Sequence, residues 1–341
     1  MAGRAELTFT DMKELPRPLS LSDGFQVTLM RPPGEPANSG SKVLIQHSSL
    51  DLLEDEEMKV LDDYDAIFEK YSLFCNGRWL GAQVLQDSQD LMYLQHIVYM
   101  KKPDVIIETG TYKGGLTYFF ASLLEWIGLE STGDSSKPPA QVVSVDRHHP
   151  DLVYNANWFC PVCADCIRPY ATPVWEKRVR FLQGYADAAD TYSEMLAHLQ
   201  HLGLLRDSSE SPAGGGGPEH GINLDVDPSK VVIVNLDANH EYEGLLKELL
   251  FYGPLVSENS YLIVQDVKLD KIWGTAGPTA ALNMFLSLAP EGEFVVEHAL
   301  KFHAYSQHMY VRRAKVTVRH TYFLEKAHAV MSAAKAKDDG A

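Results

Sequence analysis

The chain has 341 residues, of which 45% are apolar and 22% are charged, a composition typical of a folded globular protein with a substantial core. Its formal net charge of −16 disfavours binding to the phosphate backbone of nucleic acids and to anionic lipid surfaces. We expect neither a secretory signal nor a membrane span, because no apolar run approaches the roughly 18 residues that cross a bilayer.

The first third of the chain predicts an arm and one helix. Residues 1–50 are rich in Pro, Ser and Gly, which favours a loosely structured arm with a short strand near 25–29. Acidic and apolar residues recur at helical spacing over 51–72 and predict an amphipathic acidic helix. We therefore expect residues 1–77 to lie outside the main domain.

Strands and helices alternate after this arm. Helices are predicted over 90–100, 116–126, 187–202, 241–251 and 279–288, and strands over 105–107, 142–146, 179–182, 231–237 and 261–266. This alternation predicts a mostly parallel sheet with helices on both faces, and runs at 293–296 and 308–312 predict a C-terminal antiparallel hairpin. The sequence thus favours an α/β, Rossmann-like domain over 78–315, with a flexible insertion at 206–230 and a helical tail at 316–341.

A glycine-rich turn, ETGTYKGG at 108–115, follows the first of these strands. Ligands of open α/β sheets bind beyond the carboxyl ends of strands, and glycines let the backbone approach them. The turn lacks the G-x-G-x-x-G pattern of dinucleotide sites, and the acid at its head disfavours a pyrophosphate. The candidate cofactor residues are Glu108, Gly110, Thr111 and Gly114, although a tight turn without a ligand has the same pattern.

Asp146 ends the second predicted strand of the sheet. An acid in this place can accept hydrogen bonds from both hydroxyls of a ribose, and a simple strand-end turn is the alternative. Together with the glycine turn and Glu108, Asp146 favours S-adenosylmethionine over NAD as the cofactor. Asp237, at the end of the fourth strand, is included as a further cofactor contact.

Polar residues also end the fourth and fifth strands. Asp237 and His240 follow the fourth strand, and Gln265 and Asp266 close the fifth. Adjacent parallel strands would bring the two carboxylates to one rim, where their oxygens and an amide suit Mg²⁺ or Ca²⁺. A metal there would lower the pKa of a substrate hydroxyl, and His240 would take its proton. The alternative is that Asp237 only caps the next helix.

Residues 78–313 resemble the cephalosporin hydroxylase/rhamnosyl O-methyltransferase family of S-adenosylmethionine-dependent enzymes. The motifs that carry the resemblance are IIETGTYKGG at 106–115, LDANH at 236–240, YGPLV at 252–256 and YLIVQD at 261–266. The resemblance implies a Rossmann-like methyltransferase fold in which Asp237, Gln265 and Asp266 hold Mg²⁺ and His240 is the base. The family's acidic pair reads Gln265-Asp266 here, so we expect weaker Mg²⁺ binding.

Three of the four cysteines, Cys160, Cys163 and Cys166, lie in one short segment. Thiolates at C-x₂-C spacing can bind Zn²⁺, with Cys75 or a histidine at 148–149 as the fourth ligand. The alternative is reduced thiols in a loop over the site. Because the spacing is not that of a secreted disulfide framework, we predict a reducing, cytoplasmic setting.

The sequence therefore predicts an S-adenosylmethionine-dependent O-methyltransferase that acts on a hydroxyl of a sugar or small natural product. We expect this small-molecule acceptor as the partner, and neither nucleic acid nor a membrane. The sequence leaves open whether the chain forms a homo-oligomer. Alternatives are a non-catalytic protein that binds S-adenosylmethionine and metal, or a cephalosporin-hydroxylase-like component of a hydroxylation system. An NAD(P)-dependent oxidoreductase is disfavoured because the dinucleotide fingerprint is missing.

Overall fold

The computed structural model of the chain describes residues 55–130, 139–156, 160–161, 163, 165–207, 224–297 and 309–338, together with three short strands nearer the N-terminus. These strands are Glu6–Thr8 (β1), Thr28–Met30 (β2) and Lys42–Gln46 (β3), and they form an antiparallel sheet in the order β1-β3-β2. The strand expected near 25–29 overlaps β2. Most of the expected flexible insertion, from 208 to 223, lies outside the described residues.

A seven-stranded sheet in the order β13-β14-β12-β11-β6-β7-β8 forms the centre of the fold. Its strands are β6 (Val105–Thr109), β7 (Gln141–Asp146), β8 (Val179–Gln183), β11 (Val232–Leu236), β12 (Tyr261–Val264), β13 (Phe294–Val296) and β14 (Met309–Arg313). The five strands from β12 to β8 are parallel, whereas β14 pairs antiparallel with both β12 and β13. The predicted α/β, Rossmann-like sheet and its C-terminal hairpin are confirmed.

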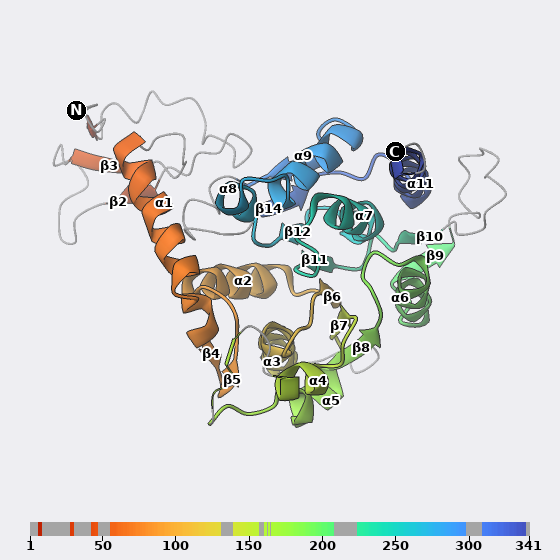
Figure 1. Ribbon diagram of the computed structural model, residues 1–341, viewed down its shortest axis with the longest axis horizontal. Helices are drawn as coiled ribbons and strands as arrows, with labels where there is room; N and C mark the ends of the chain where they lie inside the picture. Colours follow the sequence, from red (N-terminus) through yellow and green to blue (C-terminus); the bar gives the residue numbers. More distant parts are fainter. Residues whose placement is uncertain are drawn as a thin grey trace.

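Helices cover both faces of this sheet (Figure 1). They are α2 (Ser88–Lys101), α3 (Gly115–Glu130), α6 (Ala189–His201), α7 (Tyr242–Tyr252), α9 (Pro278–Leu288) and α11 (His320–Asp338). Successive side chains of β6 alternate between the faces: Ile106 packs with α2 and α3, whereas Val105 and Ile107 belong to the core shared with α6, α7, α9 and α11. This alternation explains why the strand is apolar throughout.

The acidic helix α1 (Asp55–Lys70) lies beside the domain and contacts the segment that follows β12. The Nζ atom of Lys268 lies 2.8 Å from a carboxylate oxygen of Glu69 and 4.8 Å from the ring centre of Phe68. A short helix, α8 (Leu269–Trp273), continues this segment. Among the helices that the structure describes, none has both the length and the apolar character needed to cross a membrane.

The strand order reverses between β6 and β11, because β7 and β8 extend the sheet on one side and β11 and β12 on the other. The carboxyl ends of β6, β7, β11 and β12 meet at one rim of the sheet. Ligand sites of open α/β folds lie at such a reversal, so this rim is the place where a functional site is expected.

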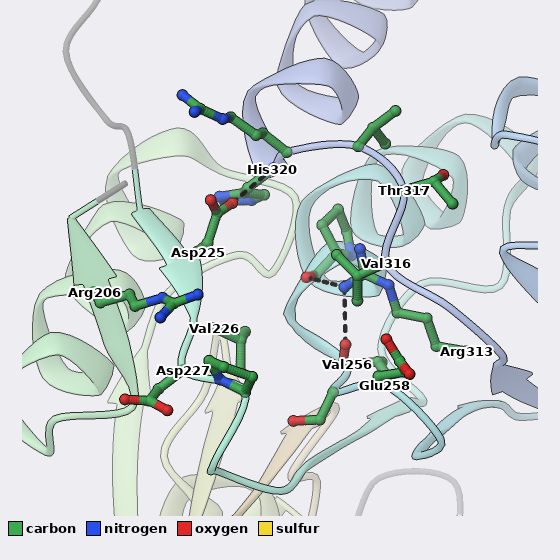
Figure 2. Close-up of a pocket in the computed structure, with 15 residues that line it drawn as sticks. Arg206, Asp225, Val226, Asp227, Val256, Glu258, Arg313, Val316, Thr317 and His320 are labelled. Carbon is green, nitrogen blue, oxygen red and sulfur yellow. Dashed lines mark hydrogen bonds between the residues drawn. The ribbon is translucent and has the colours of Figure 1, made fainter. Parts of the chain in front are cut away.

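A cavity of about 320 Å³ lies at the opposite end of the sheet, near the amino ends of β11 and β12 (Figure 2). Its wall includes Arg206, Asp225 and Arg313. Arg313 is buried, and its guanidinium is engaged by other protein groups. One nitrogen lies 2.6 Å from the Glu293 carboxylate, and another donates to the Pro254 carbonyl at 2.7 Å. This cavity is therefore separate from the rim, and the Arg313 guanidinium in its wall is already occupied by Glu293 and by backbone carbonyls.

Candidate cofactor and metal site

The glycine turn after β6 is packed too closely for side chains. Gly110 has a φ of +86°, and a Cβ atom there would lie 2.1 Å from the carbonyl oxygen of Asp237. Gly114 has a φ of +80°, and its Cβ would lie 2.8 Å from the ring of Trp175. Only glycine tolerates both the left-handed backbone and these close contacts. The two glycines therefore allow the turn to pack against Asp237, directly after β11, and against Trp175.

Glu108 lies at the head of this turn and is completely buried. Its Oε2 atom accepts hydrogen bonds from the Ser144 hydroxyl at 2.5 Å and from the Thr117 hydroxyl. Thr111 is bonded in turn to Ser144, at 2.6 Å. Burial raises the pKa of Glu108 to about 8. Its Oε1 atom has no hydrogen-bond partner among the described residues. Such a buried polar atom without a partner is costly and fits a polar group that a bound cofactor would supply.

Asp146 is the last residue of β7, on the same rim, and is half-buried. One oxygen accepts the backbone N–H of Tyr112 at 2.7 Å, and the other accepts that of His148 at 3.0 Å. These bonds are those of the strand-end turn that was the alternative to a cofactor contact. Each carboxylate oxygen has a second lone pair, so Asp146 can stabilise the turn and still accept from a ribose.

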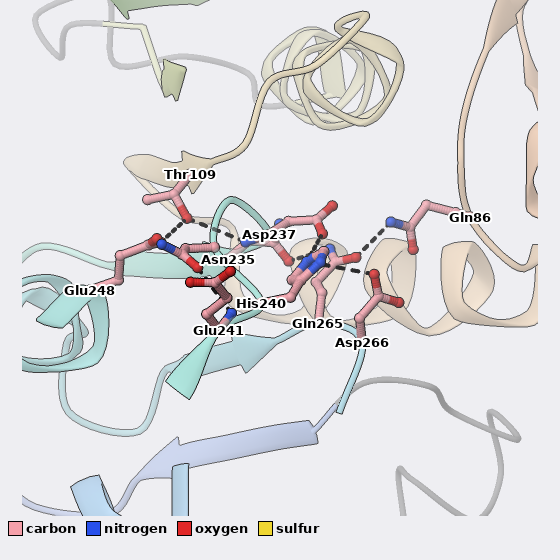
Figure 3. Close-up of polar contacts among 10 residues, drawn as sticks. Gln86, Thr109, Asn235, Asp237, His240, Glu241, Glu248, Gln265 and Asp266 are labelled. Carbon is pink, nitrogen blue, oxygen red and sulfur yellow. Dashed lines mark hydrogen bonds and ion pairs between the residues drawn. The ribbon is translucent and has the colours of Figure 1, made fainter. Parts of the chain in front are cut away.

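Asp237, His240 and Asp266 come together beyond the ends of β11 and β12 (Figure 3). The Nε2 atom of His240 lies 3.4 Å from Oδ1 of Asp237 and 3.6 Å from Oδ2 of Asp266. One ligand atom from each of the three lies within 4.8 Å of the others. The carboxylate oxygens suit a divalent cation such as Mg²⁺, and the spacing fits one shared ion.

The two carboxylates control the charge of His240. Burial lowers the pKa of the imidazole, but the hydrogen bond with Asp237 and the charge of Asp266 outweigh this effect and raise the pKa to about 9. Asp266 itself has a left-handed backbone with a φ of +54°. A non-glycine residue rarely adopts this conformation, and such strain is typical of functional sites.

Asp237 does not cap the helix that follows it, so that alternative is wrong. The N-cap residue of α7 is Glu241, and its backbone N–H donates to the side-chain oxygen of Asn239 at 2.9 Å. The Asp237 side chain is thus directed to the rim, where His240 lies.

The side chain of Gln265, the fourth rim residue predicted from the sequence, belongs to a buried chain of amides. Its Oε1 accepts from Nε2 of Gln86 at 2.6 Å, and its Nε2 donates to Oδ1 of Asn235 at 2.7 Å. All three side chains are buried. Sequence patterns identified neither Gln86 nor Asn235. Gln86 comes from a loop about 180 residues away in the chain, and Asn235 lies inside the strand β11.

Glu248 on α7 is a further buried acid that the sequence patterns missed. It accepts a hydrogen bond from the Thr109 hydroxyl at 2.7 Å, and its other oxygen has no partner among the described side chains and backbone. Burial raises its pKa to about 8. Thr109 also accepts the backbone N–H of Asp237 at 3.2 Å, so Glu248 supports the turn that carries the rim carboxylate.

Glu248→Gln is expected to change how stability depends on pH. Between the ordinary pKa of 4.5 and the folded pKa of about 8, the folded chain binds the Glu248 proton more strongly than the unfolded chain. Stability therefore falls as pH rises through this window. The variant should exceed the wild type at pH 8.5 by up to about 5 kcal/mol, the free-energy equivalent of the pKa shift, and this advantage should vanish near pH 4.5. Denaturant unfolding of both proteins at several pH values measures the difference in their free energies of unfolding.

The control for this test is Glu243→Gln, an exposed acid on the same helix, which should leave the pH dependence unchanged. An equal pH dependence in the wild type and Glu248→Gln would contradict the assignment of a raised pKa.

The cysteines form two disulfides, which corrects the predicted zinc site. Cys75 is bonded to Cys160 and Cys163 to Cys166, with Cα–Cα distances of 5.5 and 5.3 Å, so no thiol is free. The structure therefore does not support Zn²⁺ at Cys160, Cys163 and Cys166, since Cys160 pairs with a distant cysteine. Disulfides are typical of oxidising compartments. The cytoplasmic setting was predicted on the assumption of reduced thiols, which these disulfides do not meet. The setting stays a prediction.

Curated relatives are mycobacterial proteins. The chain is 24% identical over 213 residues to the rhamnosyl O-methyltransferase of Mycobacterium leprae, covering 60% of this chain and 70% of the relative. It is 22% identical to the rhamnosyl O-methyltransferase of Mycobacterium bovis, covering 60% of this chain and 66% of the relative.

Solved structures resemble the chain more distantly. A CmcI structure with Mg and SAM is 16% identical with a TM-score of 0.42, over 90% of this chain and all of the other. An O-methyltransferase from Bacillus cereus in complex with SAH is 14% identical with a TM-score of 0.36, over 72% of this chain and 84% of the other. These scores are too low to align individual site residues.

The sequence also matches a protein family over residues 71–164 and 220–314, more than half of the chain. The matched stretches contain the glycine turn, Asp146 and the three rim residues. The match confirms the family resemblance of the motifs and, with it, the prediction of a methyltransferase enzyme. The chain belongs to the rhamnosyl O-methyltransferase/CmcI family.

Proposed function

We propose that the chain transfers a methyl group from S-adenosylmethionine to a hydroxyl of a sugar or small natural product, assisted by Mg²⁺. The observation that carries this proposal is the convergence of Asp237, His240 and Asp266 beside the glycine turn, where the strand order reverses. Family membership supports the reaction, and the rhamnosyl O-methyltransferases among the relatives favour a sugar as acceptor.

The glycine turn and the acids beside it would hold the cofactor. Gly110 and Gly114 let the turn adopt its left-handed backbone against Asp237 and Trp175. Asp146 would accept from the ribose, and Glu108 offers its unpartnered buried oxygen. Thr111 would support the turn through its hydrogen bond with the Ser144 hydroxyl, which also donates to Glu108. When bound, S-adenosylmethionine supplies an electrophilic methyl group on a sulfonium, so the protein's main task is to align the acceptor with it.

Asp237 and Asp266 would hold the metal, with Gln265 contributing the remaining lone pair of its carbonyl oxygen from the buried amide chain. The residues fit this role because two half-buried carboxylates face each other across His240. When bound, Mg²⁺ would lower the pKa of the acceptor hydroxyl. His240 takes the hydroxyl proton, and the two carboxylates orient its ring.

Asp146→Ala is expected to weaken S-adenosylmethionine binding by about 1.5–3 kcal/mol, the scale of a hydrogen bond to a charged group. The variant loses the ribose acceptor and also the bonds to the backbone of Tyr112 and His148. Isothermal titration calorimetry measures the affinity, and Asp190→Ala, an exposed acid in the first turn of α6, is the control. Wild-type affinity in a folded Asp146→Ala protein would contradict the assignment.

A screen with methyl-labelled S-adenosylmethionine tests the proposed reaction. Purified chain, Mg²⁺ and a panel of hydroxylated acceptors, led by deoxyhexosides, should give labelled product and stoichiometric S-adenosylhomocysteine. Cofactor binding without transfer to any acceptor would favour the alternative of a non-catalytic binding protein.

A further inference from the structure

The Cys75–Cys160 disulfide lies directly against the glycine turn. It joins a short 3₁₀ helix (Leu73–Asn76) to the loop after α4 (Pro150–Ala156), 85 residues further along the chain. Cys160 is completely buried, and Cys75 is 7% exposed. The bond therefore fixes a buried part of the loop that borders the candidate cofactor site.

Hydrogen bonds connect both ends of this disulfide to the turn, Cys160 directly and Cys75 through Gln83. Lys113 donates from Nζ to the carbonyl of Cys160, and the Tyr112 hydroxyl is bonded to the Cys160 backbone. Gln83 donates to the Cys75 carbonyl at 2.8 Å and accepts from Lys113 at 3.2 Å. The two half-cystines and residues 112–113 of the turn thus form one connected unit.

Lys113 makes the turn sensitive to the position of Cys160. Its side chain is 1% exposed, and its partners among the described residues are uncharged oxygens and the rings of Tyr112 and Tyr154. A buried ammonium group without a carboxylate depends on every oxygen that solvates it. Movement of the Cys160 carbonyl would therefore disturb Lys113 and the glycine beside it, Gly114.

Cys163 and Cys166 form a second disulfide that is more accessible, since both are partly exposed. Cys163 is three residues from Cys166 and also three residues from Cys160, so it has C-x-x-C spacing to both. This spacing is typical of cysteines that exchange disulfides readily. The sequence therefore offers Cys163 two partners at the same spacing, Cys160 and Cys166.

We propose that Cys163–Cys166 is a thiol–disulfide exchange site that accepts electrons from a dithiol and, through Cys163, opens the Cys75–Cys160 bond and loosens the glycine turn. The consequence for cofactor affinity rests on the proposed function. The chemistry has two steps, and only the first changes the oxidation state of the chain.

In the first step a thiolate of the dithiol attacks Sγ of Cys166, and Cys163 leaves as a thiolate. The second thiol of the dithiol then resolves the mixed disulfide, so the dithiol is oxidised while Cys163 and Cys166 gain two electrons and two protons. In the second step the Cys163 thiolate attacks Sγ of Cys160. A Cys160–Cys163 bond forms, and Cys75 leaves as a thiolate that takes up the proton Cys163 gave up.

The test treats the full chain with limiting dithiothreitol, alkylates free thiols with iodoacetamide, and maps disulfides by mass spectrometry. We expect Cys166 and Cys75 to be alkylated while Cys160–Cys163 is found as a disulfide. The dissociation constant of S-adenosylhomocysteine should rise about tenfold, because a loosened loop must be ordered on binding. Alkylation of Cys163 and Cys166 with Cys75–Cys160 intact would overturn the exchange, and equal affinity in both forms would overturn its effect on the cofactor.

Two variants separate exchange from direct reduction. Cys166→Ser leaves Cys163 unpaired, so Cys160–Cys163 and a free Cys75 should form even without a reductant, with weaker S-adenosylhomocysteine binding. The double variant Cys163→Ser/Cys166→Ser lacks the attacking thiol and should keep Cys75–Cys160 and wild-type affinity under limiting dithiothreitol. Loss of affinity in the treated double variant would contradict the route. Failure of both redox forms to bind the cofactor would overturn the proposed function, while the disulfide map would still decide the exchange.

Discussion

Replacing His240 with alanine is expected to lower methyl transfer by about 10²–10⁴-fold, the usual effect of losing a positioned general base. His240 lies between Asp237 and Asp266, and both carboxylates raise its pKa to about 9 against the effect of burial. The imidazole is therefore oriented at the rim and holds a proton at neutral pH. A divalent cation on the two carboxylates would offset their charge, so that the imidazole could accept the proton of a hydroxyl. Turnover at saturating cofactor and acceptor measures the loss.

The His240→Ala variant should keep wild-type affinity for S-adenosylmethionine, because the proposed cofactor residues, the glycine turn and Asp146, lie at neighbouring strand ends. His96→Ala, an exposed histidine on α2, is the matched control and should remain fully active. An active His240→Ala enzyme would mean that the histidine is structural and that the acceptor loses its proton by another route.

Removing divalent metal with EDTA is expected to abolish turnover and to leave S-adenosylmethionine affinity nearly unchanged. Asp237 and Asp266 are the proposed cation ligands, whereas the proposed cofactor residues lie at the end of β6, in the turn after it and at the end of β7. Adding Mg²⁺ back should restore activity, and Asp266→Asn should need a higher concentration because one ligand charge is lost. Measuring turnover against free Mg²⁺ gives the apparent affinity.

Gln265→Glu provides the opposite change at the same rim. A carboxylate beside Asp266 adds a negative charge at the proposed cation site and should lower the Mg²⁺ requirement. Gln265→Met, which has similar length and no charge, is the control. Full activity of the wild type in EDTA would show that the rim carboxylates serve another purpose and that the metal-assisted mechanism is wrong.

Local sequence patterns were sufficient to predict the sheet and the contents of its rim. Apolar runs at 105–107, 231–237 and 261–266 became β6, β11 and β12, because each is short, apolar and bounded by turn-forming residues. Parallel pairing then places the residues that follow such strands at one edge. Asp237 and Asp266 could be placed together from this rule alone.

Contacts between distant parts of the chain could not be predicted in this way. Gln86 reaches Gln265 across 179 residues, and Cys75 pairs with Cys160 rather than leaving three thiols for zinc. Residue spacing carries no information on such partners, since the fold alone decides which segments meet. For the same reason the burial of Glu248, which raises its pKa, has no local signal.

A crystal structure of the chain with S-adenosylhomocysteine and Mn²⁺ tests the central claim most directly, because the anomalous signal of Mn²⁺ locates the metal. The account predicts adenosylhomocysteine along the carboxyl ends of β6 and β7, with its ribose hydroxyls on Asp146, and the metal bound by Asp237 and Asp266 beside His240. A cofactor bound elsewhere, such as the cavity beside Arg206 and Asp225, or a metal away from these two carboxylates, would contradict it.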